Sequence, residues 1–300
     1  MGDIKLFRTS GELTEEIEGQ SISIEKSLQS LIEKQLDVFL GSTFLASEYS
    51  TGKTHGGRID TLAIDENGCP VIIEYKRATN ENVINQGLFY LDWLLDHKAE
   101  FELLTLRTLG EKSAASIEWS APRLVCIAGD FTKYDVHAVQ QINRNIELMR
   151  YRSFGEDLLL LELINSVTAH ETKPQAPSSR APDKSTDEQL ADSPPEIRDL
   201  YEALKEHLLG FGDDVGVKKL KRYVAFRRIK NFACVEVHAR SRVVRAYVKV
   251  SPDSIQLEDG FTRDVRSIGH WGTGDLEITL TDGNDLERAK PLLERSYDVS

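Results

Sequence analysis

The stretch Asp60-Thr-Leu-Ala-Ile-Asp-Glu-Asn-Gly-Cys-Pro-Val-Ile-Ile-Glu-Tyr-Lys76 predicts a β-hairpin. Apolar residues fill positions 61–64 and 71–73, and Asn67-Gly68 lies between the two runs. This dipeptide readily adopts the positive φ angles that a tight turn between two strands requires. The rest of the chain is therefore expected to be arranged around this hairpin.

Three charged side chains lie at the open end of the predicted hairpin. The turn places Asp60 opposite Glu74 or Tyr75, and because side chains alternate along a strand, Glu74 and Lys76 project from one face. Charges are rarely buried unless they are paired or bind a metal. Two carboxylates predict a site for Mg²⁺ or Mn²⁺, and the lysine can stabilise charge during phosphodiester hydrolysis. An ion pair between Lys76 and one of the acids is the open alternative.

Gly-Arg-Ile-Asp60, followed by Val-Ile-Ile-Glu74-Tyr-Lys76, resembles the core of the PD-(D/E)XK nuclease superfamily. More closely, it is similar to the catalytic domain of the NucS-type (EndoMS) DNA endonucleases. The resemblance extends to Gln86 and Tyr90, which lie one helical turn apart. It implies an α/β fold with a restriction-endonuclease-like mixed sheet flanked by helices, and the activity of a metal-dependent endonuclease.

This resemblance gives the matched residues their expected catalytic and binding roles. Asp60 and Glu74 are expected to bind the metal, with the carbonyl of Tyr75 as a further ligand. Gln86 is expected to orient the lysine, the water or the phosphate. Tyr90 is expected to contact the nucleic acid, or else to pack against the sheet.

Residues on either side of this motif extend the candidate site. Glu25 begins an apolar helical pattern and matches a glutamate of the family, so it is expected to bind metal directly or through water. A first-turn glutamate favoured by the helix dipole is the alternative, and Glu33 competes for the role. Arg58, two residues before Asp60, is the candidate contact to a nucleic-acid backbone; Lys53 is equally well explained as part of a solvated loop.

Composition limits the possible classes of protein. The formal net charge is −12, so any nucleic-acid path on the molecule is expected to be narrow. Three cysteines without a CxxC pair fit a reducing compartment and argue against a zinc site. No run approaches the roughly 18 apolar residues of a membrane span, and the N-terminus lacks a signal-peptide pattern. We therefore expect a cytoplasmic protein without a membrane partner.

Hydrophobic periodicity and turn signals predict the remaining elements of the first domain. A polar segment rich in glutamate is expected after the first strand, and a glycine-rich loop over residues 49–58. The predicted strands are residues 4–8, 44–48, 124–128 and 158–163, and the predicted helices are residues 24–40, 80–97, 99–109 and 135–150.

Three regions are predicted along the chain. Residues 1–167 form the nuclease-like domain, and residues 168–195, rich in Pro, Ser and charge, form a flexible linker. Residues 196–300 form a smaller α+β domain. Its predicted helices are residues 197–209 and 284–297, and its predicted strands are residues 223–227, 233–238, 243–250 and 276–280.

The second domain is expected to bind nucleic acid or a partner, which could be a second copy of the chain. From Lys218 to Lys249 there are 11 basic residues and one acid, Glu236, with aromatic residues interleaved. Ordinary outward-facing charges on a half-buried sheet are the alternative. Residues 267–275, which include the stacking candidates His270 and Trp271, resemble a domain of uncharacterised function that often follows NucS-like nuclease domains.

Together these patterns predict an endonuclease that hydrolyses DNA phosphodiester bonds. By the family resemblance its substrate is branched, mismatched or foreign DNA, in repair or in defence. The alternative is a non-catalytic nucleic-acid-binding or regulatory protein that retains the nuclease fold.

Overall fold

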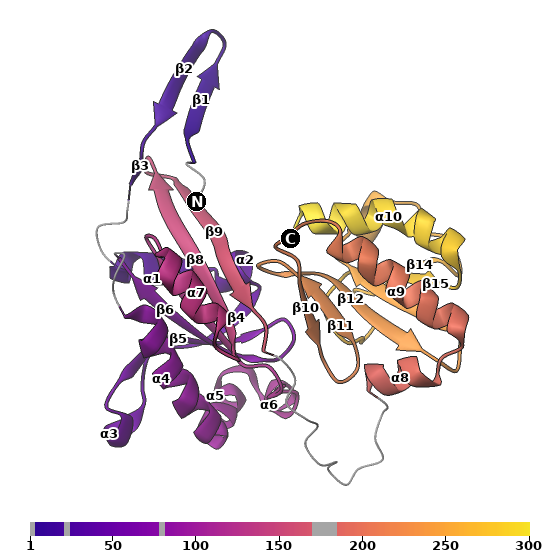
Figure 1. Ribbon diagram of the computed structural model, residues 1–300, viewed down its shortest axis with the longest axis horizontal. Helices are drawn as coiled ribbons and strands as arrows, with labels where there is room; N and C mark the ends of the chain where they lie inside the picture. The colour runs from indigo at the N-terminus through magenta and orange to yellow at the C-terminus, as the bar shows by residue number, and fades with distance from the viewer. Residues whose placement is uncertain (1–3, 21–24, 78–81, 170–184) are drawn as a thin grey trace. The chain divides into compact units, whose positions relative to one another are not determined.

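The computed structural model of the chain describes residues 4–20, 25–77, 82–169 and 185–300 (Figure 1). The chain divides into two compact units, Met1–His170 and Glu171–Ser300, each with its own hydrophobic core. Within the described ranges, no helix has the length and apolar character needed to cross a membrane.

One mixed sheet forms the centre of the first unit. Its strands are β3 (Gly19–Gln20), β4 (Ser42–Ser50), β5 (Arg58–Asp65), β6 (Pro70–Lys76), β7 (Arg123–Ala128), β8 (Asn145–Phe154) and β9 (Leu158–Val167). They lie in the order β3-β8-β7-β6-β5-β4, and β9 pairs with β8. The neighbours β4, β5 and β6 run antiparallel, whereas β6, β7 and β8 run parallel.

Helices pack against both faces of this sheet. They are α1 (Glu25–Lys34), α2 (Leu36–Leu40), α3 (Gly52–His55), α4 (Val83–Asp96), α5 (Lys98–Leu109), α6 (Glu111–Ala115) and α7 (Lys133–Gln140). Leu91 and Leu94 of α4 share a core cluster with Ile72 of β6 and Leu124 of β7. Helix α1 buries Leu28 completely and contacts β5 and β6. Burial of both sheet faces explains why β6 and β7 are almost uniformly apolar.

The N-terminal segment differs in part from its prediction. The first strand, β1, covers Leu6–Ser10, and the glutamate-rich segment after it forms a second strand, β2 (Leu13–Ile17). The two strands make a separate antiparallel sheet. Both strands are largely exposed, so charged side chains such as Glu15 and Glu16 do not prevent strand formation here. Glu16 forms an ion pair of 3.1 Å with Lys5, which lies just before β1.

The predicted helix over residues 135–150 is correct only as far as Gln140 and wrong beyond it. Helix α7 ends at Gln140, and residues 145–154 are the strand β8, which pairs with β7, β3 and β9. Its charged residues suggested a helical surface, but Arg150 is buried and paired with Glu162 at 2.5 Å. A charged residue can occupy a buried strand position when a distant partner compensates it, and local sequence does not reveal that partner.

The second unit is a six-stranded antiparallel sheet with helices. Its strands are β10 (Gly216–Lys219), β11 (Val224–Arg227), β12 (Asn231–His238), β13 (Val243–Val248), β14 (Thr262–Asp264) and β15 (Leu276–Leu280), in the order β10-β11-β12-β13-β15-β14. The helices are α8 (Thr186–Asp192), α9 (Pro195–Leu209), η1 (Pro252–Ser254) and α10 (Gly283–Asp298). Leu204 and Leu293 join Val235 and Ile278 in its core, which shows that α9 and α10 cover the sheet. The predicted α/β domain with a mixed sheet and the smaller α+β domain are confirmed.

The predicted linker over residues 168–195 needs one correction. Residues 170–184 lie outside the described part of the chain, but residues 186–192 form helix α8. The side chain of Ser185 accepts a hydrogen bond from the N–H of Glu188, and Glu188 bonds back to the N–H of Ser185. This capping box starts a helix in a sequence that is otherwise typical of a linker.

Candidate metal and nucleic-acid site

The turn of the central hairpin sets the register that builds the site. Asp65 Oδ1 accepts hydrogen bonds from the N–H groups of Asn67 and Cys69, both at 2.9 Å. Gly68 has φ 77°, the left-handed conformation that the sequence predicted for this position. From the turn, β5 and β6 keep one register from Ile64 opposite Pro70 to Thr61 opposite Ile73.

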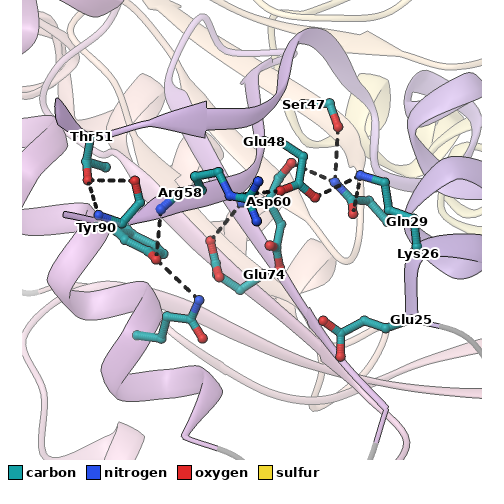
Figure 2. Close-up of polar contacts among 12 residues, drawn as sticks. Glu25, Lys26, Gln29, Ser47, Glu48, Thr51, Arg58, Asp60, Glu74 and Tyr90 are labelled. Atoms are coloured by element: carbon teal, nitrogen blue, oxygen red, sulfur yellow. Dashed lines mark hydrogen bonds and ion pairs between the residues drawn. The ribbon is translucent and has the colours of Figure 1, made fainter.

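One residue beyond that pair, Asp60 and Glu74 lie at the same level of the two strands. Glu74 Oε1 accepts a hydrogen bond of 3.2 Å from the N–H of Asp60 (Figure 2). Asp60 Oδ2 accepts one of 3.0 Å from the N–H of Tyr75. Each carboxylate is thus held by the backbone of the other strand. Glu74 is completely buried, and its second oxygen, Oε2, has no hydrogen-bond partner among the described residues.

Burial makes it costly for both carboxyl groups to carry their negative charge. It raises the pKa of Asp60, and with repulsion from Asp60 it raises the pKa of Glu74 to about 9. A proton or a cation must offset this energy at neutral pH. The two carboxyl groups therefore repel each other unless a proton or a positive charge lies between or beside them.

The ammonium of Lys76 lies at the edge of this pair. Its Nζ is 3.4 Å from Glu25 Oε1, and Glu25 Oε2 accepts a hydrogen bond from the N–H of Arg77. Burial alone would lower the pKa of Lys76, but the charges of Glu25 and Asp60 outweigh burial and raise it. Lys76 therefore stays protonated. Glu25 is brought to Lys76, whereas its competitor Glu33 accepts a hydrogen bond from Thr61, on the opposite face of β5.

Gln86 and Tyr90 form a second group, connected to Arg58. The hydroxyl of Tyr90 accepts hydrogen bonds from Gln86 Nε2 at 3.3 Å and from the N–H of Arg58 at 3.2 Å (Figure 2). Tyr90 is only 6% exposed, and its ring packs so tightly on Gly57 that a Cβ there would lie 2.6 Å from it. The structure places Tyr90 as a support for the backbone of Arg58, which favours the packing alternative. It brings Gln86 to Tyr90 rather than to Lys76.

Three polar residues that were not predicted as site residues also surround Asp60. Gln29 Nε2 donates to the carbonyl of Asp60 at 2.7 Å, and Gln29 Oε1 accepts from Lys26 at 3.2 Å. Glu48 forms ion pairs with Lys26 at 2.8 Å and with Arg58 at 3.4 Å. The sequence does offer a signal for Gln29 as a site residue, because this polar residue lies on the apolar face of α1 next to Leu28. Nothing in the sequence around Glu48 indicated its position.

The donor set fits a divalent cation that prefers oxygen ligands. Asp60 and Glu74 supply carboxylates, and the unpartnered Glu74 Oε2 is an acceptor that a cation would satisfy. The N–H and C=O of a strand residue face the same neighbouring strand, so the carbonyl of Tyr75 also faces the Asp60 side. In the described ranges no three His, Cys, Asp or Glu side chains cluster as metal ligands, so backbone and water oxygens would complete the coordination.

The basic stretch of the second unit is arranged differently from its prediction. The interleaved aromatic residues are buried and cannot stack on bases; they are Tyr223, Phe226, Phe232 and Tyr247. His270 stacks on the ring of Tyr247 at 4.5 Å between centroids. Trp271 is 47% exposed, and the guanidinium of Arg222 lies 4.0 Å from its ring centroid. Of the stacking candidates, Trp271 is the exposed one.

Fold and site together define a two-domain α/β protein with a buried acidic pair and a lysine at the open end of its central hairpin. Over residues 186–300 the chain matches a family described as a domain of unknown function (DUF5655).

Comparison with individual proteins gives one relative along nearly the whole chain. An uncharacterized protein of Haemophilus influenzae is 28% identical over 314 residues, which cover 98% of this chain and 99% of that protein. The solved "Structure of EndoMS-dsDNA2 complex" is similar over 44% of this chain, with 17% identity and a TM-score of 0.25. That match covers 47% of the solved chain.

Proposed function

We propose that the first unit is a divalent-metal-dependent endonuclease that hydrolyses DNA phosphodiester bonds. The observation that carries this proposal is the buried pair of Asp60 and Glu74, with a carboxylate oxygen of Glu74 left unpartnered and the ammonium of Lys76 beside it. The preference for DNA, and for branched, mismatched or foreign DNA, rests on the sequence resemblance alone.

Each residue of the site has its own role in the proposed reaction. Asp60, Glu74 and the carbonyl of Tyr75 would hold Mg²⁺ or Mn²⁺, which when bound supplies Lewis-acid polarisation of a phosphoryl oxygen. The ammonium of Lys76 stabilises the additional negative charge that develops on the phosphate, and donates a hydrogen bond that orients the attacking water. Glu25 fixes Lys76 in this position through the contact of 3.4 Å.

The outer part of the site binds and aligns the nucleic acid. Arg58 is 70% exposed along its side chain, so its guanidinium can reach a backbone phosphate. The bond from its N–H to Tyr90 fixes the backbone from which this guanidinium extends. Gln86 fixes the hydroxyl of Tyr90 in turn.

Cleavage of a panel of labelled substrates tests the proposal. Single-stranded, duplex, flap and mismatched DNAs and matching RNAs are incubated with Mg²⁺ or Mn²⁺ and wild type, Glu74→Gln or Lys76→Ala. The matched controls are Glu111→Gln and Lys112→Ala on α6, both exposed and outside the site.

Cutting by wild type and both controls, with loss in both site variants, is the expected result. Cutting that persists in Glu74→Gln would assign the activity to another site or to a contaminant. Binding without cutting on every substrate would favour the alternative, a nucleic-acid-binding or regulatory protein that retains this fold.

A further inference from the structure

Glu48 has an unfavourable backbone conformation within strand β4. Its φ is 51°, and Arg242 is the other non-glycine residue with a positive φ in the described part of the chain. Glycine adopts this left-handed region freely, and asparagine does so at small cost, whereas a glutamate is strained. A position where only the fold mattered would favour glycine, so the side chain of Glu48 is the feature that needs an explanation.

Strand pairing places Glu48 beside the carboxylate pair. Ser47 pairs with Thr61 and Tyr49 with Ile59, which puts Glu48 at the level of Asp60 on the neighbouring strand. Figure 2 shows the Glu48 carboxylate next to Asp60, with Lys26 and Arg58 on either side.

The two oxygens of Glu48 engage two different cations. Oε1 lies 2.8 Å from Lys26 Nζ, and Oε2 lies 3.4 Å from Arg58 Nε. The cations are largely exposed, at 55% for Lys26 and 70% for Arg58, while Glu48 is 33% exposed beneath them. Exposed ion pairs of this kind contribute little to stability, so they do not account for a strained residue.

A second contact fixes Lys26 relative to the site. Gln29 Oε1 accepts a hydrogen bond from Lys26 Nζ at 3.2 Å, and the amide of Gln29 donates to the carbonyl of Asp60 at 2.7 Å. The ammonium is therefore connected to the backbone of a carboxylate residue through one side chain. Arg58 precedes Asp60 by two residues on β5, so both cations have defined positions beside the acidic pair.

We propose that Lys26 and Arg58 form a subsite for a backbone phosphate of the nucleic acid, and that Glu48 is the positioning residue that aligns the two cations. The inference rests on the proposed function in that the ligand is a nucleic-acid phosphodiester. A phosphate oxygen can accept hydrogen bonds from both cations at once, and such contacts set the register of a strand without reading its sequence. The subsite would fix which phosphodiester lies over Asp60 and Glu74.

Fluorescence anisotropy with a labelled DNA oligonucleotide, with Ca²⁺ in place of Mg²⁺ or Mn²⁺, tests this subsite on the full chain. Lys26→Ala is expected to weaken binding roughly fivefold to tenfold and to reduce the salt-dependence slope by about one. Lys34→Ala, an exposed lysine at the other end of α1, is the control and should bind like wild type.

Two substitutions at position 48 separate positioning from folding. Glu48→Gln keeps the side-chain shape but removes its charge, and should weaken binding as Lys26→Ala does. Glu48→Gly relieves the left-handed strain, so it should unfold at the same or a higher temperature than wild type and still bind DNA more weakly. The double variant Lys26→Ala/Glu48→Gln should bind DNA no more weakly than whichever single variant binds it less well.

The outcomes distinguish this inference from the proposed nuclease activity. Binding at wild-type strength by Lys26→Ala or by Glu48→Gln would overturn the subsite, and so would a wild type that binds no DNA. Weakened binding in both variants, with no cleavage by wild type under any metal, would support the subsite and refute the nuclease.

Discussion

Glu74 accepts a hydrogen bond from the backbone N–H of Asp60, so an acidic side chain from one strand is anchored to the backbone of its neighbour. Asp60 is anchored reciprocally, through the N–H of Tyr75. The two carboxyl groups therefore cannot move apart to relieve their repulsion without breaking strand-to-strand contacts. The hairpin itself holds the two groups close together. The repulsion between them must be offset by a proton or a cation.

The stability of the first unit should fall as pH rises in the absence of divalent cations. The pKa of Glu74 rises from 4.5 to about 9 on folding, so the folded state binds a proton that the unfolded state has released over this window. Between those two pKa values, each unit rise in pH lowers the free energy of unfolding by up to about 1.4 kcal/mol through this one group. Below the unfolded pKa the contribution is fully present, and it is lost as pH approaches 9.

Glu74→Gln should remove this dependence, because the amide stays neutral at every pH. Urea denaturation in EDTA at several pH values measures the effect, with Glu111→Gln as control. We expect the variant to be more stable than wild type at the alkaline end. A wild-type profile that Glu74→Gln leaves unchanged would show that this carboxyl group is not protonated in the folded state.

Mn²⁺ should stabilise wild type, and more strongly as pH rises. A cation that binds the folded state alone stabilises it by about 2.7 kcal/mol at a hundredfold excess over its Kd, and it replaces the proton of the acidic pair. Asp60→Asn and Glu74→Gln should lose most of this shift, whereas Glu111→Gln should keep it. Thermal unfolding with and without Mn²⁺ makes the measurement. An equal shift in all four proteins would place the bound cation elsewhere.

The central hairpin and its acidic pair could be predicted because their signals are local. Asn67-Gly68 fixes the turn, and strand alternation then sets the level of Asp60 against Glu74. The elements that the sequence did not predict depend on contacts with residues elsewhere in the chain. Strand β8 looked helical because Arg150 finds Glu162 and Asp130 only in the folded sheet.

The roles of residues around the site were less predictable for the same reason. The spacing of Gln86 and Tyr90 predicts that they share one face of a helix. It does not predict the direction in which that face points. The orientation of Tyr90 depends on Gly57, which lies in a loop far away in sequence and leaves room for the ring. The strain at Glu48 is a backbone property that strand propensity does not encode.

Gly57→Ala should destabilise the first unit and displace Arg58. The new Cβ would lie 2.6 Å from the Tyr90 ring and 2.7 Å from its hydroxyl, so the ring must move and the bond to the N–H of Arg58 breaks. Overpacking of this kind costs about 1–3 kcal/mol. Tyr90→Phe removes the hydroxyl alone and should cost about 1 kcal/mol.

Denaturant unfolding of both variants measures these losses. Gly269→Ala, where a Cβ meets nothing within 4 Å, is the control and should be neutral. DNA affinity should fall in Gly57→Ala if the backbone at Arg58 sets the position of its guanidinium. A Gly57→Ala variant as stable as wild type would mean that the loop and the Tyr90 ring shift together at little cost.

Arg123 should be essential for stability at neutral pH but less so in acid. Its guanidinium is buried between Glu147, at 2.7 Å and 2.9 Å, and Asp65, at 3.1 Å. Arg123→Met removes the positive charge and leaves two buried carboxylates without it, which costs about 3–5 kcal/mol in comparable cases. Lowering the pH allows those carboxyl groups to be protonated. The stability difference from wild type should therefore shrink towards about pH 4, near the ordinary pKa of a carboxyl group.

Urea denaturation of Arg123→Met and wild type at neutral and acidic pH tests this reasoning, with the exposed Arg144→Met as control. If Arg123 contributed mainly through packing of its aliphatic part, the loss would be the same at both pH values. A loss that shrinks in acid shows instead that charge compensation holds the turn residue Asp65 in place. Because Asp65 fixes the hairpin register, Arg123→Met should also weaken Mn²⁺ binding at Asp60 and Glu74, at the far end of the same two strands.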